Sequence, residues 1–410
     1  MTFNFLFLVA IGIGFYTAFN IGANDVANSM GTSVASRALT LRQAIFIAGI
    51  FNFLGAFLAG SYVTETVRKG IINPAYFVGN ENSLIIGMIA VLAGAGIWVT
   101  VATYLKMPVS TTHSIIGALV GFGLIEVGIR GIQWKIVLTI ILTWITSPLI
   151  GALISYLLFT FIQRKILNTL NPLKEAKKIV PFLLVIVIFI LSMFFIFGGL
   201  KRFLYHFYFI YILVISAGIA FIAGLRSYFS LQKNYLRKNR GYEKTENLFK
   251  PLQILSACYE SFANGSNDVA NAAGPIAAIV MIMDTQKITS QVPIPLWILI
   301  FVGIGLVTGI STQGYRVMET IGKKITEITP TRGFAAEFGA ATVILFCSRL
   351  GIPVSTTHAS VGTVVGVGLA RGLGAIDLRV IRNIILSWLI TLPAAAGFTI
   401  VIYKLITIFI

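Results

Sequence analysis

The chain has 410 residues, of which 57% are hydrophobic and 11% are charged, and its mean hydropathy is +0.90. This composition is too apolar and too poor in charge for a soluble domain of this length. The formal net charge of +17 would suggest a nucleic-acid partner in a soluble protein, but Lys and Arg in short loops also orient membrane helices. The sequence therefore predicts an all-α integral membrane protein.

Apolar runs long enough to cross roughly 30 Å of hydrocarbon as helices recur along the chain. The first run, from residue 3, has neither the basic region nor the cleavage pattern of a signal peptide, so we expect it to be a membrane helix. The runs predict about twelve crossings, and a basic segment at 226–250 is expected to be a cytoplasmic linker. The predicted spans are 3–36, 43–63, 84–105, 109–125, 136–162, 180–200, 207–225, 251–284, 295–315, 333–350, 354–370 and 383–408.

Three motifs occur twice, in the same order and at a nearly constant offset. They are IGANDVANSMG at 21–31 and NGSNDVANAAG at 264–274, PVSTTH at 108–113 and 353–358, and IILTW at 140–144 with IILSW at 384–388. Chance does not produce three ordered matches at one spacing, so the two halves descend from one unit. The predicted organisation is a first membrane repeat at 1–163, inserted helices and the basic linker at 164–250, and a second membrane repeat at 251–410.

The distribution of basic residues predicts how the repeats are oriented. With the amino terminus outside, most Lys and Arg fall on the cytoplasmic side and the two repeats have inverted topology. If the PVSTTH segments are re-entrant hairpins that do not cross, the repeats become parallel and the charge distribution is poorer. Inversion is therefore preferred. Inverted repeats with interrupted helices are typical of secondary transporters, whose site lies near the bilayer midplane between the repeats.

Asp25 and Asp268 are the strongest sign of a functional site. An ionised carboxylate inside a membrane helix is costly and is retained where it meets a cation, a proton or a partner. A helix-capping aspartate near the membrane surface is the alternative, but both aspartates lie in the same Asn-Asp-Val-Ala-Asn sequence. Asn24 and Asn267 precede them and offer amide oxygens.

Glycines flank both motifs and suggest that the helices unwind there. Gly22 and Gly265 precede the motifs, and Gly31 and Gly274 follow them. Unwinding would free main-chain carbonyls. Carboxylate, amide and carbonyl oxygens together suit a hard cation such as sodium. The predicted sodium ligands are Asp25, Asp268, Asn24 and Asn267.

The PVSTTH motifs predict an anion site. Each proline favours the start of a helix, and the residues after it offer hydroxyls and free backbone N–H groups, which bind phosphate at helix amino termini. Packing of Ser and Thr between membrane helices is the alternative. Asn28 and Asn271 lie one turn beyond the aspartates. The predicted phosphate-binding residues are Ser110, Thr111, Thr112, Ser355, Thr356, Thr357, Asn28 and Asn271.

Several other residues have open roles. His113 and His358 end the PVSTTH motifs and could relay protons, bind the anion or cap a helix, and a structural role is favoured. Glu260 and Glu337 are either coupling groups or interfacial charges, and Trp388 is expected to be an ordinary interface or packing residue. No catalytic arrangement, P-loop or His/Cys metal cluster is present in the sequence, so neither an enzyme nor a cofactor is expected.

The paired GANDVAN and GSNDVAN motifs, each followed by PVSTTH, resemble the repeated signature of the PiT family of inorganic phosphate transporters. The resemblance spans almost the whole chain. It implies inverted repeats, a central hydrophilic loop, symport of phosphate with sodium or protons, and a homo-oligomer, with a dimer favoured. Asn264 stands where many relatives have histidine, Glu260 is not part of the pattern, and the central loop is short. These departures bear on the coupling ion more than on the anion.

Taken together, these features predict a secondary active transporter of the cell membrane. It would import inorganic phosphate by symport with sodium ions, with alternating access to a site between the repeats. The alternatives are a proton-coupled phosphate symporter, a sulfate symporter and a passive anion channel.

Overall fold

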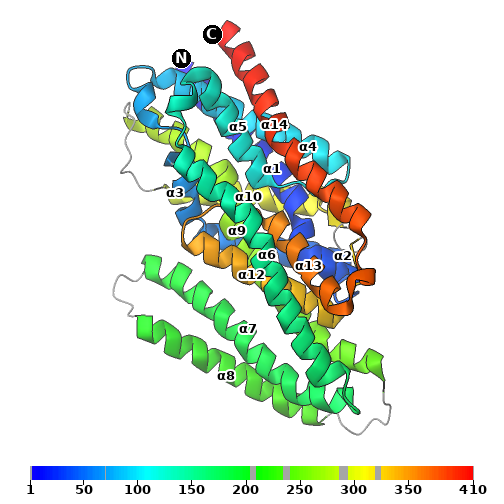
Figure 1. The fold of residues 1–410 in the computed structure, drawn as a ribbon. Helices are drawn as coiled ribbons and strands as arrows, with labels where there is room; N and C mark the ends of the chain where they lie inside the picture. The colour runs from blue at the N-terminus through cyan, green and yellow to red at the C-terminus, as the bar shows by residue number, and fades with distance from the viewer. Residues whose placement is uncertain are drawn as a thin grey trace.

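The computed structural model describes residues 2–69, 71–203, 209–233, 241–285, 294–318 and 325–409 (Figure 1). The described residues are almost entirely helical and form no β-strand, although an isolated bridge joins Ile72 and Ile132. The predicted all-α class is confirmed.

The helices follow the two repeats and the insertion between them. The first repeat contains α1 (Thr2–Ala35), α2 (Leu41–Ala59), α3 (Ser61–Lys69), α4 (Glu81–Tyr104), α5 (Thr111–Glu126) and α6 (Trp134–Ile162), with short turns η1 (Pro74–Phe77), η2 (Ile129–Gly131) and η3 (Gln163–Leu167). The insertion contains α7 (Pro172–Phe203) and α8 (Phe209–Lys233). The second repeat contains α9 (Tyr242–Thr285), α10 (Leu296–Gln313), α12 (Pro330–Arg349), α13 (Thr356–Arg371), η5 (Leu373–Ala375) and α14 (Leu378–Phe409).

Within the described residues, 8 helices are long and apolar enough to cross a membrane: α1, α2, α4, α6, α7, α8, α10 and α14. A multi-pass membrane protein is therefore supported, while the count of about twelve crossings stays a prediction. Helices α5 and α13 contain 16 residues each. At 1.5 Å per residue they are about 24 Å long, which is shorter than the roughly 30 Å of hydrocarbon in a bilayer.

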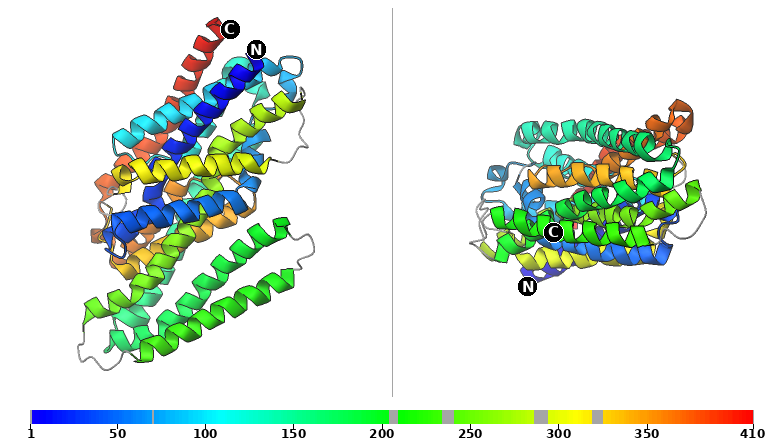
Figure 2. Two further views of the ribbon diagram at one scale, coloured as in Figure 1. Left: turned by 180° about the vertical axis from the view of Figure 1, so that it is seen from behind. Right: turned by 90° about the horizontal axis from the view of Figure 1, so that it is seen from below.

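Helices of the two repeats pack on each other in a reciprocal manner. Helix α2 of the first repeat packs on α9 of the second, and α10 of the second packs on α1 of the first. In the same way α5 packs on α14, and α13 packs on α6 (Figures 1 and 2). Because every such contact has a counterpart with the repeats exchanged, the halves are related by an approximate two-fold axis. Each repeat completes its core with helices of the other.

The glycines before the duplicated Asn-Asp motifs allow helices of the two repeats to pack closely. A Cβ atom on Gly22 would lie 2.0 Å from the carbonyl oxygen of Leu306, and one on Gly265 would lie 2.0 Å from that of Asn52. Both glycines thus permit backbone contact between helices. The predicted unwinding is wrong, since α1 and α9 remain helical through the motifs. A missing side chain allows close approach as readily as it allows a break.

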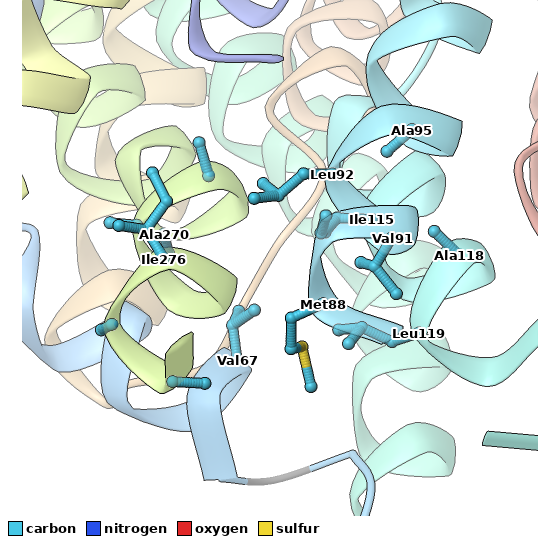
Figure 3. Packing of buried hydrophobic residues seen from close by; sticks show 14 of the residues in the cluster. Val67, Met88, Val91, Leu92, Ala95, Ile115, Ala118, Leu119, Ala270 and Ile276 are labelled. Atoms are coloured by element: carbon cyan, nitrogen blue, oxygen red, sulfur yellow. The ribbon is translucent and has the colours of Figure 1, made fainter. Parts of the chain in front are cut away.

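A large apolar cluster fixes α4 and α5 against α3 and α9. Val67, Met88, Leu92, Ile115 and Ile276 are members of it and are buried (Figure 3). Close-packed aliphatic side chains of this kind leave little freedom for neighbouring helices to shift. The cluster therefore holds the amino-terminal end of α5, where a PVSTTH motif lies, beside the motif of α9.

The inserted helices lie at the edge of the bundle. Helices α7 and α8 pack on each other, and α7 also contacts α9 (Figure 1, green). The predicted domain boundaries themselves remain predictions.

The close contacts between helices of the two repeats predict that a glycine at such a contact cannot be replaced without loss of stability. A Cβ atom on Gly309 of α10 would lie 1.8 Å from the carbonyl oxygen of Phe19, whereas one on Gly218 of α8 would meet nothing within 4 Å. We expect Gly309→Ala to lower the free energy of unfolding in detergent by about 1–3 kcal/mol through overpacking. Gly218→Ala is the control and should be neutral or stabilising, because alanine favours helix. Equal stability of the two variants would contradict the close contact.

Candidate functional site

The two Asn-Asp motifs meet where α1 and α9 cross. Ser261 Oγ donates a hydrogen bond to Ser29 Oγ at 2.9 Å, and the carboxyl groups of Asp25 and Asp268 lie within hydrogen-bonding reach of each other. Residue numbers rise along α1 as they fall along α9, so the helices are antiparallel. Equivalent helices of inverted repeats run in opposite directions, as these two do.

The PVSTTH motifs place two helix amino termini at this crossing. Helices α5 and α13 each begin directly after the serine of their motif. Ser110 Oγ accepts a hydrogen bond from the His113 N–H at 3.1 Å, and Ser355 Oγ accepts one from the His358 N–H at 3.2 Å. The predicted helix starts are confirmed. The serines act as caps that satisfy otherwise unpaired N–H groups.

The first threonine of each motif contacts the aspartate of its own repeat. Thr111 Oγ1 donates to Asp25 Oδ2 at 2.6 Å. Thr356 Oγ1 lies 3.4 and 3.5 Å from the two carboxylate oxygens of Asp268. Each repeat thus pairs one carboxylate with one hydroxyl at a helix amino terminus.

Asparagine side chains connect the two repeats. Asn28 Nδ2 donates to Thr356 Oγ1 at 3.2 Å and to Thr357 Oγ1 at 3.1 Å, and Asn271 Nδ2 donates to Thr111 Oγ1 at 3.3 Å. These bonds reach across the approximate two-fold axis. The two halves of the site are therefore one connected polar cluster.

Asn24 and Asn267 hold the extended segments that precede α5 and α13. Asn24 Oδ1 accepts from the Val109 N–H at 3.2 Å, and Asn267 Oδ1 accepts from the Val354 N–H at 3.2 Å. Asn267 Nδ2 also donates to the Val354 carbonyl at 2.8 Å. The structure thus gives both amides a positioning role, while their predicted contact with sodium stays a prediction.

The carbonyl oxygens at the site come from these extended segments and not from an unwound motif. Thr112 Oγ1 donates to the Val354 carbonyl at 3.0 Å, and Thr357 Oγ1 donates to the Val109 carbonyl at 3.1 Å. Both bonds join one repeat to the other.

All predicted site residues lie in this one buried cluster. None exposes more than the 4% of Asp25. The structure brings together every side chain that the sequence selected, and their roles as phosphate and sodium ligands remain predictions. The residues in the cluster are Asn24, Asp25, Asn28, Ser110, Thr111, Thr112, Asn267, Asp268, Asn271, Ser355, Thr356 and Thr357.

An aromatic cluster that the sequence did not reveal lies beside the site. The His113 and His358 rings are 4.5 Å apart, His113 lies 3.7 Å from Trp144, and His358 lies 3.6 Å from Trp388. His358 Nδ1 lies 2.9 Å from the Trp144 carbonyl oxygen. Trp388 thus packs on His358, and its carbonyl oxygen lies 3.5 Å from His113 Nδ1 of the first repeat. The duplicated IILTW and IILSW motifs were the signal that could have shown this.

Glu337 and Glu260 are both buried inside the protein, with 1% exposure each. Ser360 Oγ donates to Glu260 Oε1 at 2.5 Å. The Glu337 carboxylate accepts from Thr32 at 2.6 Å, Ser33 at 2.7 Å, Gln253 at 3.2 Å and Ser256 at 2.5 Å. Four neutral donors offset much of the cost of burying this carboxyl group.

These observations define a class of protein. A bundle of apolar helices encloses a polar cluster that carries two carboxyl groups, several hydroxyls and the amino termini of two helices. Buried polar groups inside membrane helices mark a path for a polar solute. The fold and the site together define a multi-pass membrane transport protein.

Comparison with known proteins places the chain in a family. Residues 21–399 match the model of the phosphate transporter family, and the chain belongs to that family. A Pyrococcus furiosus protein named as a phosphate permease is 42% identical over 412 residues, covering 97% of this chain and 96% of the relative. The chloroplastic inorganic phosphate transporter 2-1 of Arabidopsis thaliana is 40% identical, covering 95% of this chain and 70% of the relative.

A solved structure has the same fold. The structure of a sodium-dependent phosphate transporter superposes with a TM-score of 0.91 at 41% identity and covers 100% of both chains.

The two roles given to Ser355, as cap and as anion ligand, can be separated by substitution. Ser355→Ala removes the cap and should destabilise the protein by about 0.5–2 kcal/mol. Ser355→Asn keeps a capping oxygen without adding charge and should keep more of the thermal stability than Ser355→Ala, but it removes the hydroxyl from the anion site and should lower phosphate uptake. Thermal unfolding and uptake measured on both variants check this. Normal uptake by Ser355→Asn would show that the Ser355 hydroxyl is not an anion ligand.

Proposed function

We propose that the chain imports inorganic phosphate across the cell membrane by symport with sodium, with alternating access to the cluster between the repeats. The observation that carries the proposal is the direct approach of Asp25 and Asp268, one from each repeat, beside the hydroxyls of two helix amino termini. The family supports phosphate as the solute, and the sodium-dependent phosphate transporter of the same fold supports sodium as the coupling ion.

Charge balance explains why a cation is needed. Two like unit charges about 4 Å apart repel by about 4 kcal/mol at an effective dielectric constant of about 20. Phosphate would add one or two further negative charges next to Asp25 and Asp268. The hydrogen-bond partners described for these aspartates are Thr111, Asn28, Asn267 and Thr356, all of them neutral. Bound sodium ions would supply the missing positive charge, so cation and anion would each favour the binding of the other.

The anion half of the site would consist of neutral donors. Thr111 and Thr356, at the starts of α5 and α13, offer hydroxyls, and the N–H ends of both helices favour negative charge. The amides of Asn28 and Asn271 lie next to these hydroxyls. A tetrahedral oxyanion held between two such half-sites would contact both repeats, so their relative movement would carry it from one side of the membrane to the other.

Topology and assembly complete the proposal. The antiparallel crossing of α1 and α9 supports inverted repeats. The distribution of Lys and Arg supports an amino terminus outside and a cytoplasmic segment 226–250, of which 234–240 lies outside the described residues. A homodimer is expected from the resemblance to the PiT family. Native mass spectrometry in a mild detergent measures this, and a monomeric mass would contradict it.

Removing either central charge should abolish coupled transport. Asp25→Asn and Asp268→Asn keep the shape of the side chain but lose the carboxylate, and we expect both to reduce sodium-dependent phosphate uptake in proteoliposomes to background. Asp284→Asn is the control, because Asp284 lies at the exposed end of α9 and should tolerate the change. Wild-type uptake by either test variant would refute the assignment.

The coupling ion can be identified by ion replacement. With sodium replaced by choline at fixed pH, phosphate accumulation should fall to background, and an inward proton gradient should not restore it. Restoration by the proton gradient would instead support the proton-coupled alternative. Failure to accumulate phosphate above its external concentration under any gradient would indicate a passive channel. Excess sulfate should compete less well than unlabelled phosphate, and equal competition would favour a sulfate symporter.

A further inference from the structure

Arg316 stands out among the cationic side chains of the described residues. Its Cζ atom lies 4.7 Å from the ring centroid of Tyr104 and 5.6 Å from that of Tyr315. Its Nε atom is buried and has no hydrogen-bond partner within the described part of the chain. A guanidinium held by aromatic rings keeps its planar fork of N–H donors for another ligand, and carboxylates and phosphates fit that fork.

Other arginines of the structure are used differently. Arg332 and Arg371 form ion pairs with Glu327 at 3.1 and 3.2 Å. Arg316 forms no ion pair among the described residues. Within the described part of the chain, no carboxylate therefore neutralises its positive charge.

Arg316 faces a pocket of about 420 Å³ that also contains Lys106 in its lining. Of the described residues, two cationic side chains and no carboxylate line the pocket. Gly31, which also lines the pocket, follows Asn28 by one helical turn on α1. The pocket thus extends from the cationic residues to within one turn of the buried cluster. Its remaining lining residues are Val34, Ala35, Leu41, Tyr315 and Met318.

The opposite end of the bundle has a matching arginine but almost no space. Arg349 Cζ lies 4.6 Å from the Tyr62 ring centroid and 3.8 Å from that of Phe197, and the cavity there measures about 10 Å³. Leu41, the first residue of α2, lines the large pocket, whereas Ala59, the last residue of α2, lines the small cavity. The two cavities therefore lie at opposite ends of α2, and the one beside Arg316 is much the larger.

We propose that Arg316 and Lys106 form a second, weaker oxyanion site, in which inorganic phosphate pauses between the aqueous phase and the buried cluster. This inference rests on the proposed function, because it assumes that phosphate passes through the pocket. Arg316 supplies paired N–H donors, and Lys106 supplies a second charge. The positive lining concentrates anions at the mouth of the path and excludes cations from the same place. Unlike the buried cluster, this site has no carboxylate among its described lining residues, so we expect phosphate to occupy it without sodium.

The difference in sodium dependence provides the test. Phosphate binding to the purified full-length protein is measured by ³¹P NMR line broadening, first in choline and then in sodium medium. The wild type should show weak, salt-sensitive binding in choline and additional tight binding in sodium. Arg316→Gln should weaken the binding in choline medium at least ten-fold. The tight sodium-dependent binding should remain, and its presence also shows that the variant is folded. Arg349→Gln is the matched control and should leave the binding in both media unchanged.

Each outcome decides a separate question. Two results would overturn the second site and leave the proposed function intact. One is tight binding in sodium medium without any binding in choline medium. The other is binding in choline medium that survives Arg316→Gln. If binding in choline medium is lost in Arg316→Gln and no tight binding appears in sodium medium, the result would support the second site and count against the proposed function. Arg316→Lys keeps the charge without the planar fork and should retain part of the weak binding, and full retention would show that charge alone is sufficient.

Discussion

The approach of two buried carboxyl groups, Asp25 and Asp268, is the constraint on which the rest of the structure depends. Such a pair is unfavourable inside a membrane protein unless a cation or a proton lies with it. Both aspartates belong to unbroken helices, α1 and α9, that cross in opposite directions. The crossing places their side chains at the centre of the polar cluster, and the surrounding hydroxyls and amides orient them. The same two helices therefore determine both where the two carboxyl groups lie and how the two repeats are oriented relative to each other.

The reciprocal packing of helices between the repeats explains how this arrangement is held. Asn28 bonds to the second PVSTTH motif, and Asn271 bonds to the first. The His113 and His358 rings meet edge to face across the repeats, and each packs on the tryptophan of its own repeat. Neither repeat contains a complete site. A ligand bound at the axis therefore contacts both repeats, and its binding free energy can act on their relative positions.

Much of the site could be predicted because the sequence repeats itself. One aspartate in apolar sequence has ordinary explanations, but two in identical surroundings, each followed by PVSTTH, do not. The helix starts at Ser110 and Ser355 were also predictable, because proline and a capping serine act locally. Composition was sufficient for the all-α membrane class.

The remaining features depend on contacts that a linear pattern does not contain. Gly22 and Gly265 suggested breaks in helices, but they permit contact with Leu306 and Asn52 from the other repeat. A glycine that breaks a helix and a glycine that permits close packing look the same in a sequence, and only the position of the neighbouring helix distinguishes them. Glu337 was ambiguous for a related reason. Its donors come from α1 and α9, which are far from α12 in sequence, so its burial and its hydrogen bonds could not be inferred.

The central claim is that cation and phosphate share one site built around Asp25 and Asp268. Thermodynamic linkage tests it most directly, because two ligands that stabilise each other must do so by the same factor. Isothermal titration of the purified protein would measure phosphate affinity with and without sodium, and sodium affinity with and without phosphate. Equal and large increases in both affinities are predicted. A phosphate affinity that does not change with sodium would contradict the account.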